Sequence, residues 1–161
     1  MTAEDVYRRL IGGQRTQSFD AFDLHVVASI LALAVCEAHA EGKPVYEAVG
    51  LDGPALSRLL RRMFSHAAAL FLNNGRPSLA RGEDEACLLD LLKRGGTEGS
   101  PFEALLAGMI ARRAQRPNHL WQDLGLRDRG ELSLLMTRHF APLAGRNSKD
   151  MKWKKFFYRT I

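Results

Sequence analysis

Two histidines in the last third of the chain, His119 and His139, are the side chains best suited to binding a transition metal. Imidazole is a competent ligand for such metals, and the two rings would approach each other if the last helices fold back on one another. Histidine is also a common, partly buried polar residue. The alternative is therefore structural, with His119 capping a helix and His139 half buried.

The two cysteines, Cys36 and Cys87, are spaced neither as a disulfide framework nor as a zinc site. Cys36 and His39 could share an ion on one helical face, but no third ligand accompanies them, so a core cysteine and a helix-end histidine are the simpler interpretation. Cys87 follows three acidic residues, 83–85, which suit a helix N-terminus. We expect Cys87 itself to be packed.

The C-terminal segment, residues 146–161, concentrates cations and aromatic rings. It carries six cations and one anion, so its net charge of +5 equals that of the whole chain and residues 1–145 balance to zero. At about 100° per residue, one helical face carries an apolar stripe formed by Trp153, Phe156, Phe157 and Thr160. A separate stripe carries Lys152, Lys155 and Arg159. One face can pack on the protein while the other presents cations. We assign partner docking to Lys152, Trp153, Lys154, Lys155, Phe156, Phe157 and Arg159.

Four stretches of the last third follow the order and spacing of a known family. They are NHLWQDLGL at 118–126, ELS at 131–133, RHF at 138–140 and MKWKKFFYR at 151–159. With them the chain strongly resembles the nitrogen-fixation family NifQ. The resemblance implies a protein that carries a molybdenum–iron–sulfur cluster and supplies molybdenum for the nitrogenase iron–molybdenum cofactor. It also implies cofactor-assembly partners, namely a scaffold and the nitrogenase iron protein.

In that family the stretch resembling 151–159 is followed by a cysteine-rich tail, C-x4-C-x2-C-x5-C, to which the cluster is attributed. The sequence ends at Ile161, before such a tail. Iron–sulfur clusters are held by several cysteine thiolates. We therefore expect residues 1–161 to form a cluster-free body, with truncation and evolutionary loss of the tail both open.

The loop ahead of the terminal helix is a second candidate site, because molybdenum travels as the molybdate dianion. Oxyanions bind where helix N-terminal amides meet Arg or Lys. Arg146 and Lys149 flank Asn147 and Ser148 in this loop. We take Arg146 and Lys149 as candidate oxyanion ligands.

Apolar residues recur at helical spacing and strand-like alternation is absent. The pattern predicts an all-α, single-domain bundle of about seven to eight helices around a buried central helix. That helix is capped by Ser18 or Asp20 and runs to about Ala40. Its eleven-residue apolar middle, 26–36, is shorter than the roughly 20 residues of a bilayer span. Residues 1–145 are predicted to form a body on which a helix at 146–161 packs.

The other predicted helices cover residues 3–11, 44–49, 83–94, 101–113, 120–124 and 129–140, the last closed by Pro142. A further helix from Pro54 could extend as far as Leu72. Turn-forming residues predict breaks at 73–77 and at 95–99, the second a candidate hinge.

Composition narrows the function classes. Apolar residues make up 46% and charged residues 25%, as in ordinary soluble proteins, and the N-terminus lacks a signal peptide, so we expect a cytoplasmic protein. Nucleophile elbow, Walker, Rossmann and HExxH patterns are missing, so an enzyme with its own turnover is not expected. Nucleic-acid binding is disfavoured because a basic patch without a recognisable binding fold is common. We expect a NifQ-like molybdenum donor or carrier; the alternative is a helical protein–protein interaction module without metal chemistry.

Overall fold

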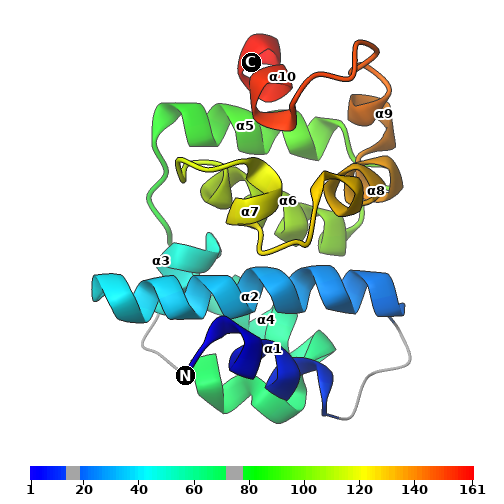
Figure 1. The fold of residues 1–161 in the computed structure, drawn as a ribbon. Coiled ribbons are helices and arrows are strands. Elements are labelled where there is room, and N and C mark those ends of the chain that lie inside the picture. The colour runs from blue at the N-terminus through cyan, green and yellow to red at the C-terminus, as the bar shows by residue number, and fades with distance from the viewer. Residues whose placement is uncertain (14–18, 72–77) are drawn as a thin grey trace. The chain divides into compact units, whose positions relative to one another are not determined.

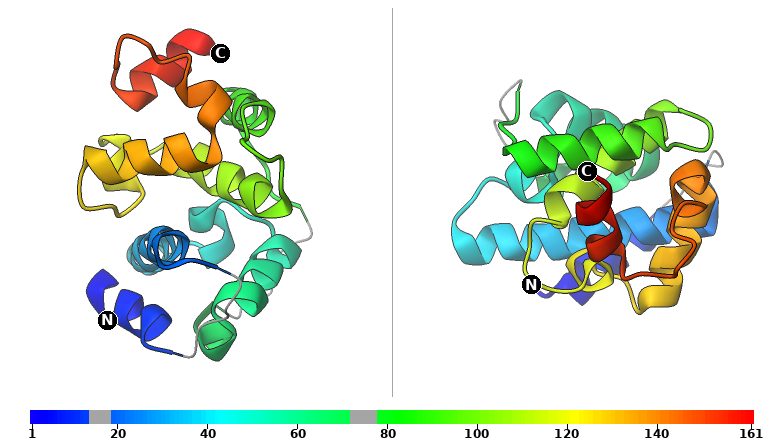
Figure 2. Two further views of the ribbon diagram at one scale, coloured as in Figure 1. Left: turned by 90° about the vertical axis from the view of Figure 1, so that its right-hand side faces the viewer. Right: turned by 90° about the horizontal axis from the view of Figure 1, so that it is seen from above.

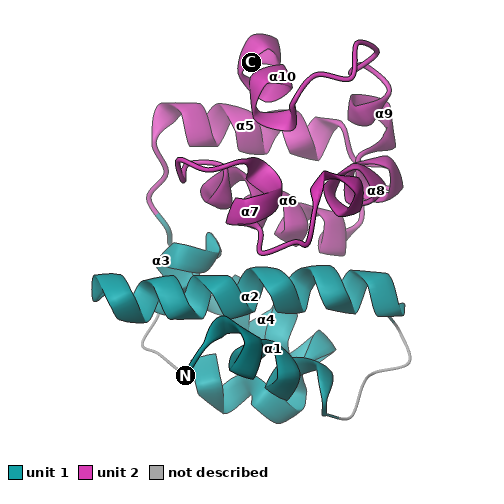
Figure 3. Cartoon of the chain, viewed as in Figure 1, with its two compact units in different colours: residues 1–79 teal, residues 80–161 magenta. Residues whose placement is uncertain are grey.

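The structure is a computed structural model that describes residues 1–13, 19–71 and 78–161. Every regular element in these residues is a helix (Figure 1), which confirms the all-α prediction. Eight of the described helices have at least seven residues. They fall into two compact units, Met1–Leu79 and Ala80–Ile161 (Figure 3). The predicted division into a body of 1–145 and a terminal helix at 146–161 that packs on it in the same domain stays a prediction.

The first unit contains α1 (Ala3–Ile11) and α2 (Ala21–Glu41), which pack against each other (Figure 1). Thr2 and Asp5 form a capping box at the start of α1, since each side chain accepts a hydrogen bond from the other residue's backbone N–H. The side chain of Asp20 caps α2, and Gly42 ends it in the left-handed conformation, with φ of 66°. The alternative cap, Ser18, lies outside the described residues.

Helix α2 is long and apolar enough to span a membrane by length and composition, a test that core helices also pass. In the structure, 67% of its most apolar window is buried, including every residue from Val26 to Ala32. It packs on α1 and α3 (Val45–Val49) within the first unit. This is the burial expected of the predicted central helix.

Helix α4 (Gly53–Met63) is capped by Asp52 and is followed by a short 3-10 helix, η1 (Ser65–Phe71). The predicted continuation of α4 is therefore wrong. The chain leaves the α conformation at Phe64, where φ is −142° and ψ is 51°, and the resulting bend buries Phe64, Ala67 and Phe71. The predicted end at Leu72 and the predicted break at 73–77 lie outside the described residues.

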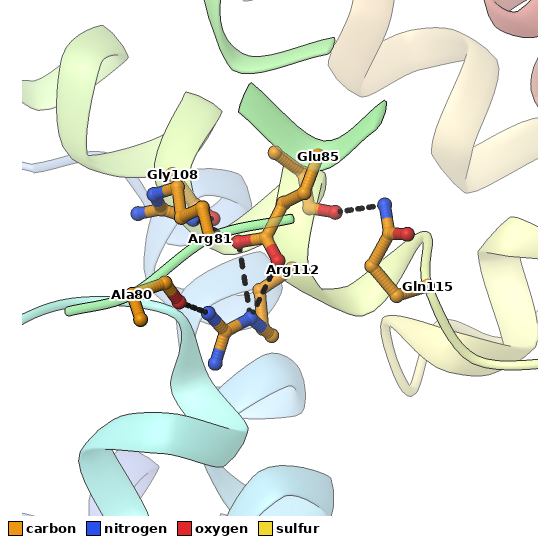
Figure 4. Close-up of polar contacts among 7 residues, drawn as sticks. Ala80, Arg81, Glu85, Gly108, Arg112 and Gln115 are labelled. Atoms are coloured by element: carbon orange, nitrogen blue, oxygen red, sulfur yellow. Dashed lines mark hydrogen bonds and ion pairs between the residues drawn. The ribbon is translucent and has the colours of Figure 1, made fainter. Parts of the chain in front are cut away.

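The second unit is built on α5 (Glu83–Arg94) and α6 (Pro101–Arg113), which pack against each other (Figure 1). The buried Glu85 carboxylate joins them. Arg112 Nε donates to both of its oxygens at 3.0 Å, and Arg81 also pairs with it (Figure 4). Arg112 Nη2 reaches the Ala80 carbonyl at 2.8 Å. A buried carboxylate is tolerated when it is paired in this way, so the acidic start of α5 fixes the helix pair.

The loop between α5 and α6 was a candidate hinge in the sequence. In the structure it is held by hydrogen bonds. Glu103 Oε1 accepts the N–H groups of Glu98 and Gly99, each at 2.9 Å. Thr97 N–H donates to the His139 carbonyl, and its hydroxyl accepts from the Ala141 amide, both at 2.9 Å. The loop is therefore tied both to α6 and to the chain after α8.

The last four helices are α7 (Leu120–Asp123), α8 (Arg129–His139), α9 (Ala141–Ala144) and α10 (Trp153–Thr160). The sequence predicted that Pro142 closes α8. In the structure Pro142 stands instead in the first turn of α9. This first turn suits proline because its missing N–H has no helical partner there. Figure 2 (right) shows α10 crossing the second unit between α5 and the segment of α7 and α8.

Candidate binding site at the C-terminal helix

A hollow in the second unit lies where α10 meets α7 and α8. Its volume is about 300 Å³, at the lower end of the range for ligand pockets. The lining residues come from the turn before α7, from α7, from α8 and from the start of α10: Asn118, His119, Leu120, Trp121, Arg129, Leu132, Lys152, Trp153, Lys154 and Lys155. We call this hollow the α10 pocket. It contains part of the predicted docking segment and one of the two predicted histidines.

The aromatic face of α10 anchors the helix within the second unit itself. Trp153, Phe156 and Phe157 are all buried, at 7%, 6% and 0% exposure. The Trp153 and Phe156 rings meet edge to face with centroids 6.0 Å apart, a favourable aromatic geometry. The indole N–H of Trp153 donates to Ser133 Oγ on α8 at 3.3 Å. The apolar stripe therefore packs inward, as its spacing predicts, and these three side chains are buried within the unit rather than exposed for the partner docking assigned to them.

Lys154 differs from the prediction that it faces a partner, because its ammonium group is engaged inside the unit. Its Nζ lies 2.6 Å from Asp123 Oδ2 and 2.5 Å from the Asn118 carbonyl, and it also donates to the carbonyl of Arg116. Asp123 is only 2% exposed, and its other carboxylate oxygen accepts from Asn118 Nδ2 at 3.0 Å. We call this group the Lys154–Asp123 lock. It ties α10 to α7.

The buried Arg113 of α6 also contacts Asp123 of the lock. Its side chain is 1% exposed, and its Nε donates to the backbone carbonyl of Asp123 at 2.8 Å. The backbone of Asp123 is thus held by Arg113 of α6, and its carboxylate is held by Lys154 of α10. The walls of the α10 pocket that α7 and α10 supply are accordingly held in place.

Lys152, Lys155 and Arg159 lie on the exposed side of α10, as the spacing predicted. Lys152 and Lys155 border the α10 pocket, and within the described part of the chain neither amine has a hydrogen-bond or ion-pair partner. The first turn of α10 contains no acidic residue. These two lysines therefore place uncompensated positive charge at the pocket edge.

Arg129 adds a third cation to this edge. Its guanidinium donates to Asp150 Oδ1 at 2.8 Å and to the Met151 carbonyl at 3.1 Å. The hydrogen bond and the charge of Arg129 hold the pKa of the exposed Asp150 carboxyl below its usual range. Asn147 completes the turn, since its side chain bonds both the N–H and the C=O of Met151 at 2.9 Å.

The two candidate metal-binding histidines are placed in different surroundings. His119 is the exposed N-cap residue of α7, where its N–H donates to Gln122 Oε1 at 3.1 Å and its ring lies parallel to Trp121. His139 is half buried, with Nδ1 3.3 Å from Glu103 Oε2 and its ring edge to face with Phe102. The helix-capping and half-buried interpretations fit these positions. Among residues 1–13, 19–71 and 78–161, no group of three His, Cys, Asp or Glu side chains could hold a metal ion.

The two candidate oxyanion ligands lie in the loop between α9 and α10. Arg146 borders a second hollow of about 240 Å³, together with Arg94 and Thr160. Lys149 is exposed and lines neither hollow. Asn147, between them, is engaged with Met151. Arg146 therefore shares a hollow with Arg94, and the pairing of Arg146 with Lys149 at an oxyanion stays a prediction.

Several pocket residues were missed by the sequence reasoning. Trp121, Arg129 and Leu132 line the pocket, and Asp123 holds its wall. The signal available for three of them was their presence in the NHLWQDLGL and ELS stretches. Arg129 had none, since it lies between those stretches and looks like an ordinary helix-start residue.

The cysteines do not provide a ligand set for an iron–sulfur cluster. Cys36 is part-buried on α2 of the first unit, where burial raises the pKa of its thiol. Cys87 is exposed on α5 of the second unit, so the expectation that it is packed was wrong. The 161 residues contain no other cysteine, and such clusters need several thiolates.

Comparisons with known proteins give one consistent family. Residues 26–161 match the NifQ family. The chain is 41% identical over 142 residues to a protein NifQ homolog of Sinorhizobium fredii (strain NBRC 101917 / NGR234), a match covering 87% of this chain and 61% of that protein. It is 37% identical over 133 residues to protein NifQ of Rhodobacter capsulatus, covering 82% of this chain and 72% of the relative.

A shorter match has a higher sequence identity. Over 54 residues the chain is 54% identical to protein NifQ of Klebsiella pneumoniae, covering 34% of this chain and 32% of that protein. The chain therefore spans less than two thirds of the Sinorhizobium relative that it matches. No solved structure matches the chain.

Proposed function

The chain belongs to the NifQ family, and from this premise we propose that it serves nitrogen fixation as a donor or carrier of molybdenum for the nitrogenase iron–molybdenum cofactor. The observation that carries the proposal is the match over residues 26–161, which includes the whole second unit. The molybdenum–iron–sulfur cluster is the cargo in this proposal. The protein acts as an accessory protein of the cytoplasm rather than as a catalyst with its own turnover.

Residues 1–161 supply the platform and not the ligands of this cargo. Their two cysteines lie in different units. In the family, the cluster is assigned to a four-cysteine segment that follows the stretch resembling 151–159. A segment attached after Ile161 would start directly at α10, which ends at Thr160. The Lys154–Asp123 lock fixes α10 to the second unit and would hold the start of such a segment in a defined place.

The exposed cations of α10 suit contact with another protein during transfer. Lys152, Lys155 and Arg159 are exposed, whereas three aromatic residues of the same helix are buried, namely Trp153, Phe156 and Phe157. Charged patches of this kind steer encounters with partners of opposite charge. By resemblance to the family, the partners are proteins of cofactor assembly, a scaffold and the nitrogenase iron protein.

A diazotroph whose own NifQ gene is deleted provides the test in cells. It would receive this chain extended after Ile161 by the family's four-cysteine segment, or by the same segment with serine at all four positions as the matched control. The readout is molybdenum per purified nitrogenase at limiting molybdate.

We expect the cysteine version alone to restore molybdenum. Equal restoration by the serine version would remove cluster carriage from the proposal. If neither version restores molybdenum while both still bind the assembly proteins, the protein is an interaction module without metal chemistry, which is the alternative.

A further inference from the structure

We propose that the α10 pocket binds an acidic segment of a partner protein that inserts one leucine or aromatic side chain between Trp121 and Trp153. The proposal goes beyond the handling of molybdenum, because it assigns a binding site and the chemistry of the segment that fills it. It rests on the proposed function only in requiring that the protein has a protein partner.

The pocket walls favour an apolar side chain. Leu120 and Leu132 are buried at 3% and 1% exposure, and Trp153 is buried at 7%. Trp121 is half buried beside them. A bare oxyanion would lose its hydration against these surfaces at high cost, whereas a leucine or phenyl group would be stabilised by burying its apolar area there.

The pocket edge favours negative charge around that side chain. The amines of Lys152 and Lys155 have no partner within the described residues. In the same part of the chain, the guanidinium of Arg129 bonds the 81% exposed Asp150 side chain and the carbonyls of Asp150 and Met151. Exposed ion pairs contribute little to stability, so an incoming carboxylate can replace Asp150 at little cost. Positive charge around an apolar pocket complements an acidic segment with an apolar anchor.

The residue types also suit a protein interface. Trp and Arg are enriched among the few interface residues that contribute most of the binding energy, and such residues lie in well-packed, desolvated pockets. The α10 pocket brings two tryptophans and an arginine together. The Lys154–Asp123 lock and the bond from Trp153 to Ser133 hold two of the walls before any partner arrives, which lowers the ordering cost of binding.

The chain carries its own reporter of this binding. It contains two tryptophans, and both line the pocket. A tryptophan-free peptide can therefore be titrated into the metal-free protein while indole fluorescence and the two indole N–H signals in NMR spectra are followed. The probe is a seven-residue peptide with a central leucine flanked by three glutamates on each side. One companion peptide has alanine at the centre and another has lysine in place of glutamate.

Two double variants distinguish the contribution of the pocket lysines to peptide binding from the effect of net charge. Lys152→Glu with Lys155→Glu reverses the two lysines of the pocket edge. Lys149→Glu with Arg127→Glu reverses two exposed cations of the same unit that do not line the pocket, and it changes the net charge by the same amount. We expect the leucine peptide to shift both indole signals and to bind the pocket variant at least about tenfold more weakly than the control variant.

Four outcomes would overturn the proposal: no binding of the leucine peptide, equal binding of the alanine peptide, equal loss in the two double variants, or indole signals that do not move. A further arm uses phenylacetate; displacement of the peptide by phenylacetate at equal affinity would make the pocket a small-molecule site instead. None of these measurements involves a metal. A failure here therefore leaves the molybdenum proposal standing, and the reverse also holds.

Discussion

Replacing Lys154 with methionine should destabilise the second unit by about 3 kcal/mol, because it removes the cation from a buried carboxylate. The Asp123 side chain is 1% exposed and the Lys154 side chain 20%. Breaking a buried ion pair by removing one partner costs about 3–5 kcal/mol. The lower end applies here because the lysine is partly exposed, and because Asn118 Nδ2 still donates to the carboxylate.

Replacing Asp123 with asparagine should cost less, about 1–2 kcal/mol. The amide keeps the size of the carboxyl group, and the Lys154 ammonium retains two carbonyl acceptors and access to water. With both residues replaced, no uncompensated charge remains. In a double-mutant cycle, the sum of the two single destabilisations should therefore exceed the destabilisation of the double variant by about 2 kcal/mol.

Urea unfolding followed by tryptophan fluorescence is the assay, since both tryptophans lie in the second unit. The matched control is Lys155→Met, one residue further along α10, where the lysine is exposed and a change should stay within about 0.5 kcal/mol. If Lys154→Met costs no more than Lys155→Met, or if the cycle shows no coupling, the lock does not fix α10.

Three further predictions follow from single contacts. The Arg129 hydrogen bond and charge lower the pKa of Asp150, so its stabilising contribution is present above the ordinary carboxyl pKa and is lost as pH falls through the lowered value; NMR titration should show the Asp150 pKa returning to the usual range in Arg129→Met. Burial raises the pKa of the Cys36 thiol, so iodoacetamide at neutral pH should modify the exposed Cys87 first, as peptide mass spectrometry would show; equal rates would contradict this. Glu85→Gln should destabilise the second unit by about 3 kcal/mol in the urea assay, since it leaves two clustered arginines unneutralised, and a change below 1 kcal/mol would contradict this.

Helix ends were predictable wherever a local signal decides them. Asp20 and Ser100 accept hydrogen bonds from amides three residues ahead, and Gly42 adopts a positive φ. Each of these effects acts within one helical turn. The apolar stripe of α10 was predictable for the same reason, since its period of 3–4 residues is local.

Long-range partners were not predictable from spacing. Lys154 joins Asp123, 31 residues away in the sequence, and helical periodicity carries no information about a contact between two helices. The same limit applies to the histidines. Whether His119 and His139 approach each other depends on how α7 and the end of α8 are placed, and the structure gives them separate partners.

The end of α4 shows a conflict between propensity and packing. Alanines 67–69 favour continued helix, yet the chain bends at Phe64 and continues as a 3-10 helix. The bend buries the Phe64 ring at 1% exposure. Tertiary burial outweighs propensities of a few tenths of a kcal/mol per residue.

Metal analysis after anaerobic reconstitution tests the central claim most directly, namely that residues 1–161 are the platform and not the ligand set of a molybdenum carrier. The chain and a version extended after Ile161 by the four-cysteine segment would each be incubated with iron, sulfide and molybdate. Molybdenum and iron per protein would then be measured. We predict that only the extended version retains both metals. Retention of molybdenum by the chain itself would contradict the account and direct attention to His119 and to the Arg94–Arg146 hollow.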